Sequence, residues 1–258
     1  MQTKTLTPYL QQYLKDKGKL FIPYIMAGAN GLERLPQEIE ELAKSGACAI
    51  ELGIPFSDPV ADGPVIQQAG LDALCQGVTL KKIIRLLQTM SSDIPLILMG
   101  YANSFFHYGL EQLTDDLRTT AVKGLIIPDL PYEHQELVAP FLASSDLSLI
   151  QLVTLTSSRE RIAQLTTAGE GFVYAVTVNG TTGLGKTYST SLNKHLAAIK
   201  EISPIPVLAG FGISSTEDVH RFTSVCDGVI VGSKIVSLLS SEGTQAAGQF
   251  IKQATESL

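Results

Sequence analysis

Glu51 and Asp62 are the residues of this sequence whose type and setting best suit acid–base chemistry. Glu51 lies inside the apolar run CAIELGI at residues 48–54, so a strand there would bury its carboxyl group. An ionised carboxylate that is buried without a partner costs several kcal/mol, or its pKa rises, which suits a general acid or base near neutral pH. The alternative is a buried glutamate held by a structural hydrogen bond.

Asp62 lies eleven residues after Glu51, in the segment IPFSDPVADGP, which also contains Asp58. This segment is long for a strand-to-helix connection and contains three prolines. Taken alone, each aspartate suits a turn or a helix N-cap, where aspartate is favoured. Two carboxylates close to a buried glutamate instead favour a catalytic role for one of them.

Glycine-rich turns follow the last two apolar runs. Gly210-Phe211-Gly212 ends the run at residues 204–212, and Gly232-Ser233 ends the run at residues 227–233. Glycine lets backbone N–H groups approach an anion closely, and a helix that starts after the second turn adds a favourable dipole. The pattern predicts a site for the phosphate group of a small molecule, with plain turn glycines as the alternative.

A third glycine-rich segment, GTTGLGKT at residues 180–187, matches the nucleotide-binding pattern GxxxxGK[ST] and follows an apolar run. However, the residues after Thr187 read as more loop rather than as a helix. The later apolar runs end in glycine instead of an aspartate that could bind Mg²⁺. We interpret the segment as a lid loop over the site and keep a nucleotide-binding protein as an alternative.

Eight short apolar runs alternate with amphipathic stretches along the chain, as expected for strands buried on both faces of a parallel sheet. This α/β pattern predicts a single-domain (β/α)8 TIM barrel over residues 1–258, with an extra N-terminal helix at 7–17. The expected strands are 21–27, 48–54, 95–101, 124–130, 147–153, 171–178, 204–212 and 227–233. The expected helices are 32–45, 64–75, 80–90, 110–122, 133–142, 159–168, 192–202, 217–224, 233–240 and 244–256.

The predicted barrel indicates where the catalytic residues should lie, because active sites of such barrels are at the C-terminal ends of the strands. Side chains alternate along a strand, so Glu51 shares a face with Gly53, while Ile50 and Leu52 face the helices. Glu51 is therefore predicted to point into the barrel near its mouth.

Composition excludes several classes of protein. The formal net charge is −6, and no block of lysine or arginine indicates nucleic-acid binding. We expect a cytoplasmic protein, because the sequence has no membrane-spanning apolar stretch, no secretory signal and only three scattered cysteines. The four scattered histidines argue against a metal site, and no apolar run carries an internal lysine for Schiff-base chemistry. Composition does not exclude a barrel that uses a flavin or nicotinamide cofactor. Of the other chemistries, metal-free acid–base chemistry on a phosphorylated substrate with an apolar body remains.

The segment ELGIPFSDPVADGPVIQ at residues 51–67 resembles the signature of the tryptophan synthase alpha subunit family. The resemblance covers nearly the whole chain and includes FIPYIMAG at 21–28, LMGYAN at 98–103, IIPDLP at 126–131, FVYAVT at 172–177 and GFGIS at 210–214. It implies a (β/α)8 barrel that cleaves indole-3-glycerol phosphate to indole and glyceraldehyde 3-phosphate by a retro-aldol reaction.

The resemblance also implies roles for individual residues. Glu51 would protonate indole C3 and accept the glycerol hydroxyl proton, Asp62 would hold the indole N–H, and Tyr174 would position Glu51. Thr182 would contact Asp62 when the loop closes. The indole pocket would be lined by Phe21, Ile66, Met99, Tyr101 and Ile126, and the phosphate would be held by Gly183, Phe211, Gly212, Gly232 and Ser233.

A partner follows from the same resemblance. The family pairs with a pyridoxal-phosphate beta subunit in an αββα complex and passes indole to it, so this chain itself would need no cofactor. The matching contact residues are Pro55, Phe56, Ser57, Asp58, Pro59, Asp129 and Pro131.

Two features of this chain depart from the family pattern. Ala29-Asn30 stands where the family usually has Asp-Pro, and Val178 stands where some members have arginine. A free-standing lyase that is active without a partner is an alternative. Another is a mainly allosteric subunit, which the presence of both Glu51 and Asp62 argues against.

Overall fold

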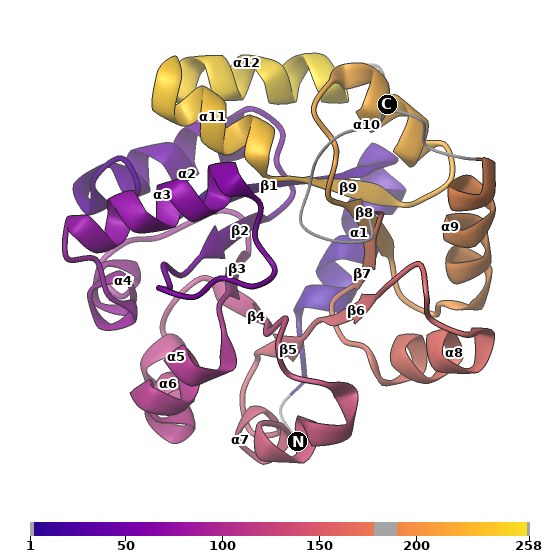
Figure 1. Ribbon diagram of the computed structural model, residues 1–258, viewed down its shortest axis with the longest axis horizontal. Helices are drawn as coiled ribbons and strands as arrows, with labels where there is room; N and C mark the ends of the chain where they lie inside the picture. The colour runs from indigo at the N-terminus through magenta and orange to yellow at the C-terminus, as the bar shows by residue number, and fades with distance from the viewer. Residues whose placement is uncertain (1–2, 178–189, 257–258) are drawn as a thin grey trace.

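A barrel of parallel strands surrounded by helices forms the computed structural model, which describes residues 3–177 and 190–256 (Figure 1). The nine strands follow the order β5-β4-β3-β2-β1-β9-β8-β7-β6. Their bounds are β1 Leu20–Met26, β2 Ile50–Gly53, β3 Leu96–Met99, β4 Val122–Ile126, β5 Ser148–Leu149, β6 Gln151–Val153, β7 Val173–Val176, β8 Val207–Gly210 and β9 Gly228–Val231.

The barrel closes through the strand predicted at residues 147–153. Only Ile150 separates β5 from β6; β5 pairs with β4, and β6 pairs with β7. The two short strands therefore act as one, which brings the nine assigned strands to the eight positions expected of a (β/α)8 barrel. The predicted fold is confirmed by this topology.

Helices follow the strands and cover the outside of the barrel (Figure 1). Their bounds are α1 Leu6–Lys17, η1 Leu32–Arg34, α2 Leu35–Lys44, α3 Pro64–Cys75, α4 Leu80–Leu87, α5 Ala102–Tyr108, α6 Leu110–Leu117, η2 Tyr132–Leu137, α7 Ala139–Leu142, α8 Arg159–Ala168, α9 Thr190–Ile202, α10 Thr216–Thr223, α11 Ser233–Ser241 and α12 Thr244–Thr255. No helix in these described parts of the chain is long and apolar enough to cross a membrane.

Three helix predictions need correction. The predicted helix 110–122 ends at Leu117, because β4 already begins at Val122. The predicted helix 133–142 is a 3₁₀ segment followed by the short α7, since Pro140 cannot continue a helix that starts earlier. The α5 helix at Ala102–Tyr108 was not predicted at all.

Two glycines inside the barrel make room for tyrosine rings. A Cβ atom on Gly53 would lie 2.0 Å from the hydroxyl oxygen of Tyr24, and one on Gly210 would lie 2.3 Å from Cε1 of Tyr174. Each glycine ends its strand, so both rings lie at the C-terminal end of the barrel. The absence of a Cβ atom at Gly53 and Gly210 therefore leaves room for the inward-pointing rings of Tyr24 and Tyr174.

The N-terminal segment closes the opposite end of the barrel. Leu6 of α1 is fully buried, and its Cδ2 would lie 3.1 Å from a Cβ on Gly124 and 2.8 Å from one on Gly171. In Figure 1, α1 lies behind the strands. The apolar face of α1 therefore covers the N-terminal end of β4 and the segment before β7. We call residues 4–17 the N-terminal plug.

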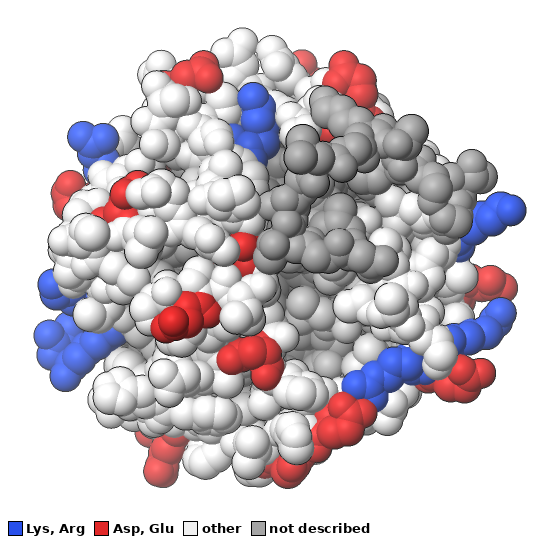
Figure 2. Space-filling model, viewed as in Figure 1, with Lys and Arg blue, Asp and Glu red and all other residues white. Residues whose placement is uncertain are grey.

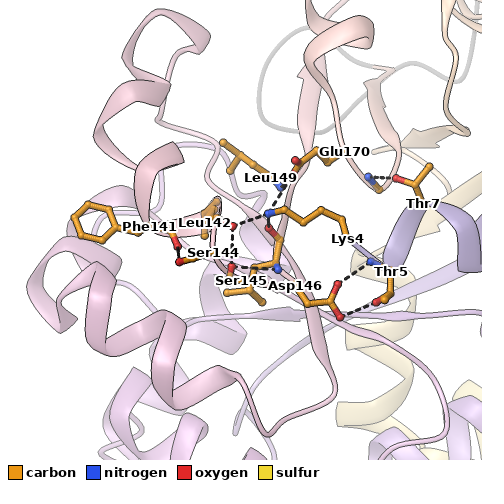
Figure 3. A network of polar contacts seen from close by, with 12 residues as sticks. Lys4, Thr5, Thr7, Phe141, Leu142, Ser144, Ser145, Asp146, Leu149 and Glu170 are labelled. Carbon is orange, nitrogen blue, oxygen red and sulfur yellow. Dashed lines mark hydrogen bonds and ion pairs between the residues drawn. The ribbon is translucent and has the colours of Figure 1, made fainter. Parts of the chain in front are cut away.

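Polar contacts fix this plug to the second half of the chain (Figure 3). The Lys4 ammonium donates to the Leu142 carbonyl oxygen at 2.9 Å and pairs with Glu170 at 3.5 Å. Thr5 donates from its backbone N–H and from its hydroxyl to Asp146, each at 2.7 Å. Partial burial acts to raise the pKa of Asp146, but Thr5 and Lys123 outweigh it and hold that pKa below its ordinary value.

Replacing Asp146 with alanine is expected to lower the free energy of unfolding by about 1–3 kcal/mol, because it removes both Thr5 hydrogen bonds and the Lys123 ion pair. The carboxylate stabilises the fold above its ordinary pKa, and this contribution is lost as the pH falls. Urea unfolding at neutral pH and in acid measures both effects. Asp93→Ala, at an exposed position, is the control. A D146A variant as stable as wild type at neutral pH would contradict the prediction.

Candidate active site

The Glu51 carboxyl group lies at the centre of the candidate active site. Glu51 is in β2, beside Tyr24 of β1, and its side chain is 0% exposed. Neither of its carboxyl oxygens has a hydrogen-bond partner among the described residues. Burial, and then the nearby Asp62 carboxylate, raise its pKa to about 8. Glu51 therefore holds a proton near neutral pH; its predicted burial is confirmed, and its acid–base role stays a prediction.

Asp62 lies in the segment between β2 and α3 and is 6% exposed. The Tyr101 hydroxyl donates to Asp62 Oδ2 at 3.0 Å and accepts from the Ala61 N–H at 2.9 Å. The side-chain amide of Gln67 donates to the Asp62 carbonyl oxygen at 2.8 Å. Burial raises the pKa of Asp62, and the Tyr101 hydrogen bond opposes that rise. The side chain and backbone of Asp62 are thus both held in place.

Tyr24 and Tyr174 complete the group around the two carboxyls. Burial is the main reason that the pKa of each tyrosine lies well above its ordinary value, and the Glu51 and Asp62 charges add to it. Both tyrosines therefore remain protonated and can donate hydrogen bonds. The Glu51 charge acts on Tyr174, but neither Glu51 oxygen has a hydrogen-bond partner among the described residues, so the predicted positioning of Glu51 by Tyr174 stays a prediction.

The predicted apolar wall is mostly present, but Phe21 is not part of it. Met99 of β3 and Ile126 of β4 are paired in register, and both are buried at the same end of the barrel. Phe21 instead packs edge-on against Phe250 of α12, with ring centroids 6.4 Å apart, and therefore faces the outer helices. The β1 residue on the Glu51 side is Tyr24.

The reason for this correction is the alternation of side chains along β1. Residues an odd number of positions apart face opposite sides of a strand, so Phe21 and Tyr24 cannot both point inward. The pairing of Tyr24 with Glu51 decides which of them does. We therefore assign this part of the pocket to Tyr24.

The predicted phosphate loops differ in how their helices begin. Helix α10 is capped by the Ser215 hydroxyl, and the Asp218 side chain completes a capping box. Helix α11 begins after Gly232 with no side-chain cap. The first N–H groups of α11 are therefore the ones that an anion can satisfy, which supports the predicted role of Gly232 and Ser233.

Ile66, which is predicted to line the indole pocket, lies beside Gly232 of the predicted phosphate site. A Cβ on Gly232 would lie 3.3 Å from Cδ1 of Ile66 and 3.7 Å from Cβ of Tyr24. A Cβ at position 232 would therefore be tight against Ile66 and in ordinary van der Waals contact with Tyr24. Glycine at this position keeps the start of α11 close to the barrel interior.

Phe211 has a backbone conformation that is unusual for an aromatic residue. Its φ angle is +73°, and among the described non-glycine residues it alone has a positive φ. Such a conformation costs roughly 1–2 kcal/mol for a residue with a Cβ atom. The Phe211 ring lies 5.8 Å from the Tyr174 ring, so the turn that carries it is packed against Tyr174.

The two predicted partner-contact segments meet at Tyr101. Phe56 stacks on the Tyr101 ring, with centroids 4.9 Å apart and an interplanar angle of 24°. Asp129 Oδ1 accepts a hydrogen bond from the Ala102 N–H at 2.9 Å. Ser57, Asp58, Asp129 and Pro131 are exposed, Phe56 and Pro59 are half-buried, and Pro55 is buried.

On the face drawn in Figure 2, lysine and arginine side chains lie mainly near the rim, and several acidic side chains lie nearer the middle. The described residues of this face therefore form no continuous basic patch of the kind that binds nucleic acid. No three His, Cys, Asp or Glu residues within 3–177 and 190–256 are placed to hold a metal ion.

Several predictions concern residues that the structure does not describe. Thr182, Gly183 and the whole GTTGLGKT segment lie outside the described residues. Their assignments to substrate contact, phosphate binding, a lid or a nucleotide site remain predictions from the sequence.

Sequence reasoning missed Tyr24 and Thr177. Tyr24 could have been found from strand alternation, because it is the polar aromatic residue of an otherwise apolar run. The Thr177 hydroxyl contacts the turn after β8, which is distant in sequence. No local pattern in the sequence indicates that contact.

Comparisons with known proteins agree with one another. Residues 10–257 match the family described as Tryptophan synthase alpha chain. A tryptophan synthase alpha chain from Listeria innocua is 52% identical over 254 residues, which covers 98% of each chain. A solved alpha chain from Legionella pneumophila is 28% identical with a TM-score of 0.87, covering 99% of this chain and 97% of that one. An aminoacrylate-bound tryptophan synthase structure from Mycobacterium tuberculosis is 28% identical with a TM-score of 0.87, covering 98% of each chain.

The burial of Glu51 makes wild-type stability depend on pH in a way that Glu51→Gln should remove. The folded state keeps a proton up to about pH 8, whereas the unfolded chain releases it near the ordinary carboxyl pKa, so wild-type stability falls as the pH rises through this window. The stability of E51Q relative to wild type should rise by about 2–4 kcal/mol between pH 5 and pH 8.

Urea unfolding of both proteins at several pH values measures this difference. Glu111→Gln, at an exposed position, is the control and should leave a constant difference from wild type. A difference between E51Q and wild type that does not change with pH would show that the Glu51 pKa is not raised.

Proposed function

Because this chain belongs to the tryptophan synthase alpha chain family and is a lyase that cleaves indole-3-glycerol phosphate, we propose that Glu51 and Asp62 perform this cleavage. The observation that carries the proposal is the Glu51 carboxyl group, which is fully buried and has no partner among the described residues. A group in that state is available to exchange a proton with a substrate rather than with a neighbouring side chain.

The reaction needs one proton to move to carbon and another to leave oxygen. Protonated Glu51 donates to indole C3, and the ring nitrogen becomes positively charged. The resulting Glu51 carboxylate accepts the proton of the hydroxyl group on the carbon attached to C3. The carbon–carbon bond then breaks, its electrons return to the ring, and indole and glyceraldehyde 3-phosphate form.

Asp62 stabilises the charge that develops on the indole nitrogen. Its Oδ2 is already held by the Tyr101 hydroxyl, which leaves Oδ1 to accept the indole N–H. A fixed, buried carboxylate stabilises a developing positive charge more than it would in water. The protonated indole ring is the electron sink, so this step needs neither a lysine nor a metal ion.

The substrate phosphate binds at the start of α11. Gly232 and Ser233 offer backbone N–H groups that no side chain of the described residues caps. Phe211 and Gly212 approach from the turn after β8, and we expect Gly183 to contribute from the segment that the structure does not describe. The indole ring lies against Tyr24, Ile66, Met99, Tyr101 and Ile126.

A beta subunit is the proposed partner, in an αββα complex in the cytoplasm. The Mycobacterium tuberculosis structure is titled as tryptophan synthase, which supports such an assembly for a chain that resembles it throughout. Residues 55–59 and 129–131 would form the contact, and the Phe56–Tyr101 stack connects it to Asp62. Pyridoxal phosphate would belong to the beta subunit.

Glu51→Gln is expected to reduce indole release from indole-3-glycerol phosphate by about 100- to 10,000-fold or more, because the amide cannot exchange the proton. Asp62→Asn should cost a comparable factor while retaining the shape of the side chain. Steady-state assays with and without a beta subunit measure both effects. Asp72→Asn, on the exposed side of α3, is the control for loss of a nearby carboxylate. Near-normal turnover by E51Q would overturn the acid–base assignment.

Phe56→Leu tests the proposed link between the partner and Asp62. It removes the stack on Tyr101, so the isolated chain should keep most of its activity while stimulation by a beta subunit falls by about three- to tenfold. Phe106→Leu, at another exposed aromatic position, serves as the control. Full activity of the wild-type chain without any beta subunit would instead favour the free-standing lyase.

A further inference from the structure

We propose that Thr177 is a positioning residue for the phosphate site, acting through the backbone of Phe211. The proposal rests on the proposed function in one respect, since it takes the turn at 210–212 as part of the phosphate site. Thr177 directly follows β7, is 3% exposed and does not itself need to touch substrate. Its role follows from what its hydroxyl contacts.

The Thr177 hydroxyl lies between two consecutive carbonyl oxygens of the turn after β8. Its Oγ1 is 2.7 Å from the Gly210 oxygen and 2.5 Å from the Phe211 oxygen. The Thr177 N–H also donates to the Gly210 oxygen, at 3.1 Å. The residue that directly follows β7 therefore holds two successive peptide groups of a turn that lies more than thirty positions later.

This turn is also the place where the backbone is strained. Phe211 has a φ of +73°, a conformation that a residue with a Cβ atom adopts rarely and only where its surroundings hold it. The Tyr174 ring packs against Gly210 on β8 and lies beside the Phe211 ring. Tyr174 therefore fixes the position of the turn, and the Thr177 hydroxyl fixes the direction of its carbonyls.

Carbonyl direction determines where the next N–H points. In a trans peptide the C=O and N–H bonds point in opposite directions, and the described residues contain no cis peptide. With the Phe211 oxygen held toward Thr177, the Gly212 N–H points away from Thr177. We infer that these contacts set the backbone of the turn at residues 210–212, which the proposed function places in the phosphate site.

The test compares Thr177→Val with Thr177→Ser. Valine keeps the shape and removes the hydroxyl, so KM for indole-3-glycerol phosphate and the inhibition constant of inorganic phosphate should both rise by about tenfold, with kcat changed less than about threefold. Serine keeps the hydroxyl and should restore both constants to within about threefold of wild type. A general loss of packing would not produce this separation of KM from kcat with rescue by serine.

Thr223→Val is the matched control. Thr223 is also buried, and its hydroxyl also contacts two carbonyl oxygens, those of Val219 and His220, within α10. Its loss removes the same kind of hydrogen bond at a position that does not hold the turn, so both constants should stay near the wild-type values. Thermal unfolding of every variant identifies any that do not fold.

If Thr177→Val does not fold, Thr177→Cys replaces it, because a thiol is a weak donor of similar size. It should raise both constants by a smaller factor than valine would. Wild-type constants in the valine or cysteine variant, or a loss confined to kcat, would overturn the proposal. If inorganic phosphate fails to compete with substrate in wild type, the phosphate site itself is wrong, which is a separate failure from that of Thr177.

Discussion

The arrangement of the site depends on the Glu51 carboxyl group, which is buried and has no hydrogen-bond partner among the described residues. Ionised Glu51 would be unfavourable at the centre of a packed barrel, so the group keeps its proton to about pH 8. The neighbouring side chains are arranged so that they do not neutralise it: Tyr101 bonds to Asp62 rather than to Glu51, and no lysine or arginine is among the influences on its pKa. The barrel thereby keeps a protonated carboxyl group in its interior, as the proposed proton transfer to a substrate requires.

The two helices beside the proposed phosphate site, α10 and α11, differ in how their N-terminal N–H groups are satisfied. Helix α10 satisfies its own first N–H groups with Ser215 and Asp218, and it serves as part of the frame. Helix α11 leaves that position without a side-chain cap after a glycine, where the barrel interior is close. The difference lies in a few residues at the start of each helix, and it supports the proposal that the phosphate binds at α11 rather than at α10.

Local patterns in the sequence predicted the strands, most helices and the inward direction of Glu51, because alternation and apolar runs are local properties. They failed where the outcome depends on distant residues. Phe21 was placed in the pocket although Tyr24 faces inward, and the pairing of β1 with β2 settles that choice. The contacts Tyr101–Asp62 and Thr177–Phe211 join separate βα units, so only the closed barrel brings them together.

The N-terminal plug has a consequence for how the chain folds during synthesis. Lys4 and Thr5 contact Leu142, Asp146 and Glu170, so α1 cannot dock in its final place until the chain has been synthesised past residue 170. Contacts of such large sequence separation close long loops and form late in folding. The apolar face of α1, which includes Leu6 and Leu10, therefore stays exposed to solvent until those later residues have been synthesised. The contact that covers the N-terminal end of the finished barrel therefore also leaves an apolar helix face uncovered while the barrel is incomplete.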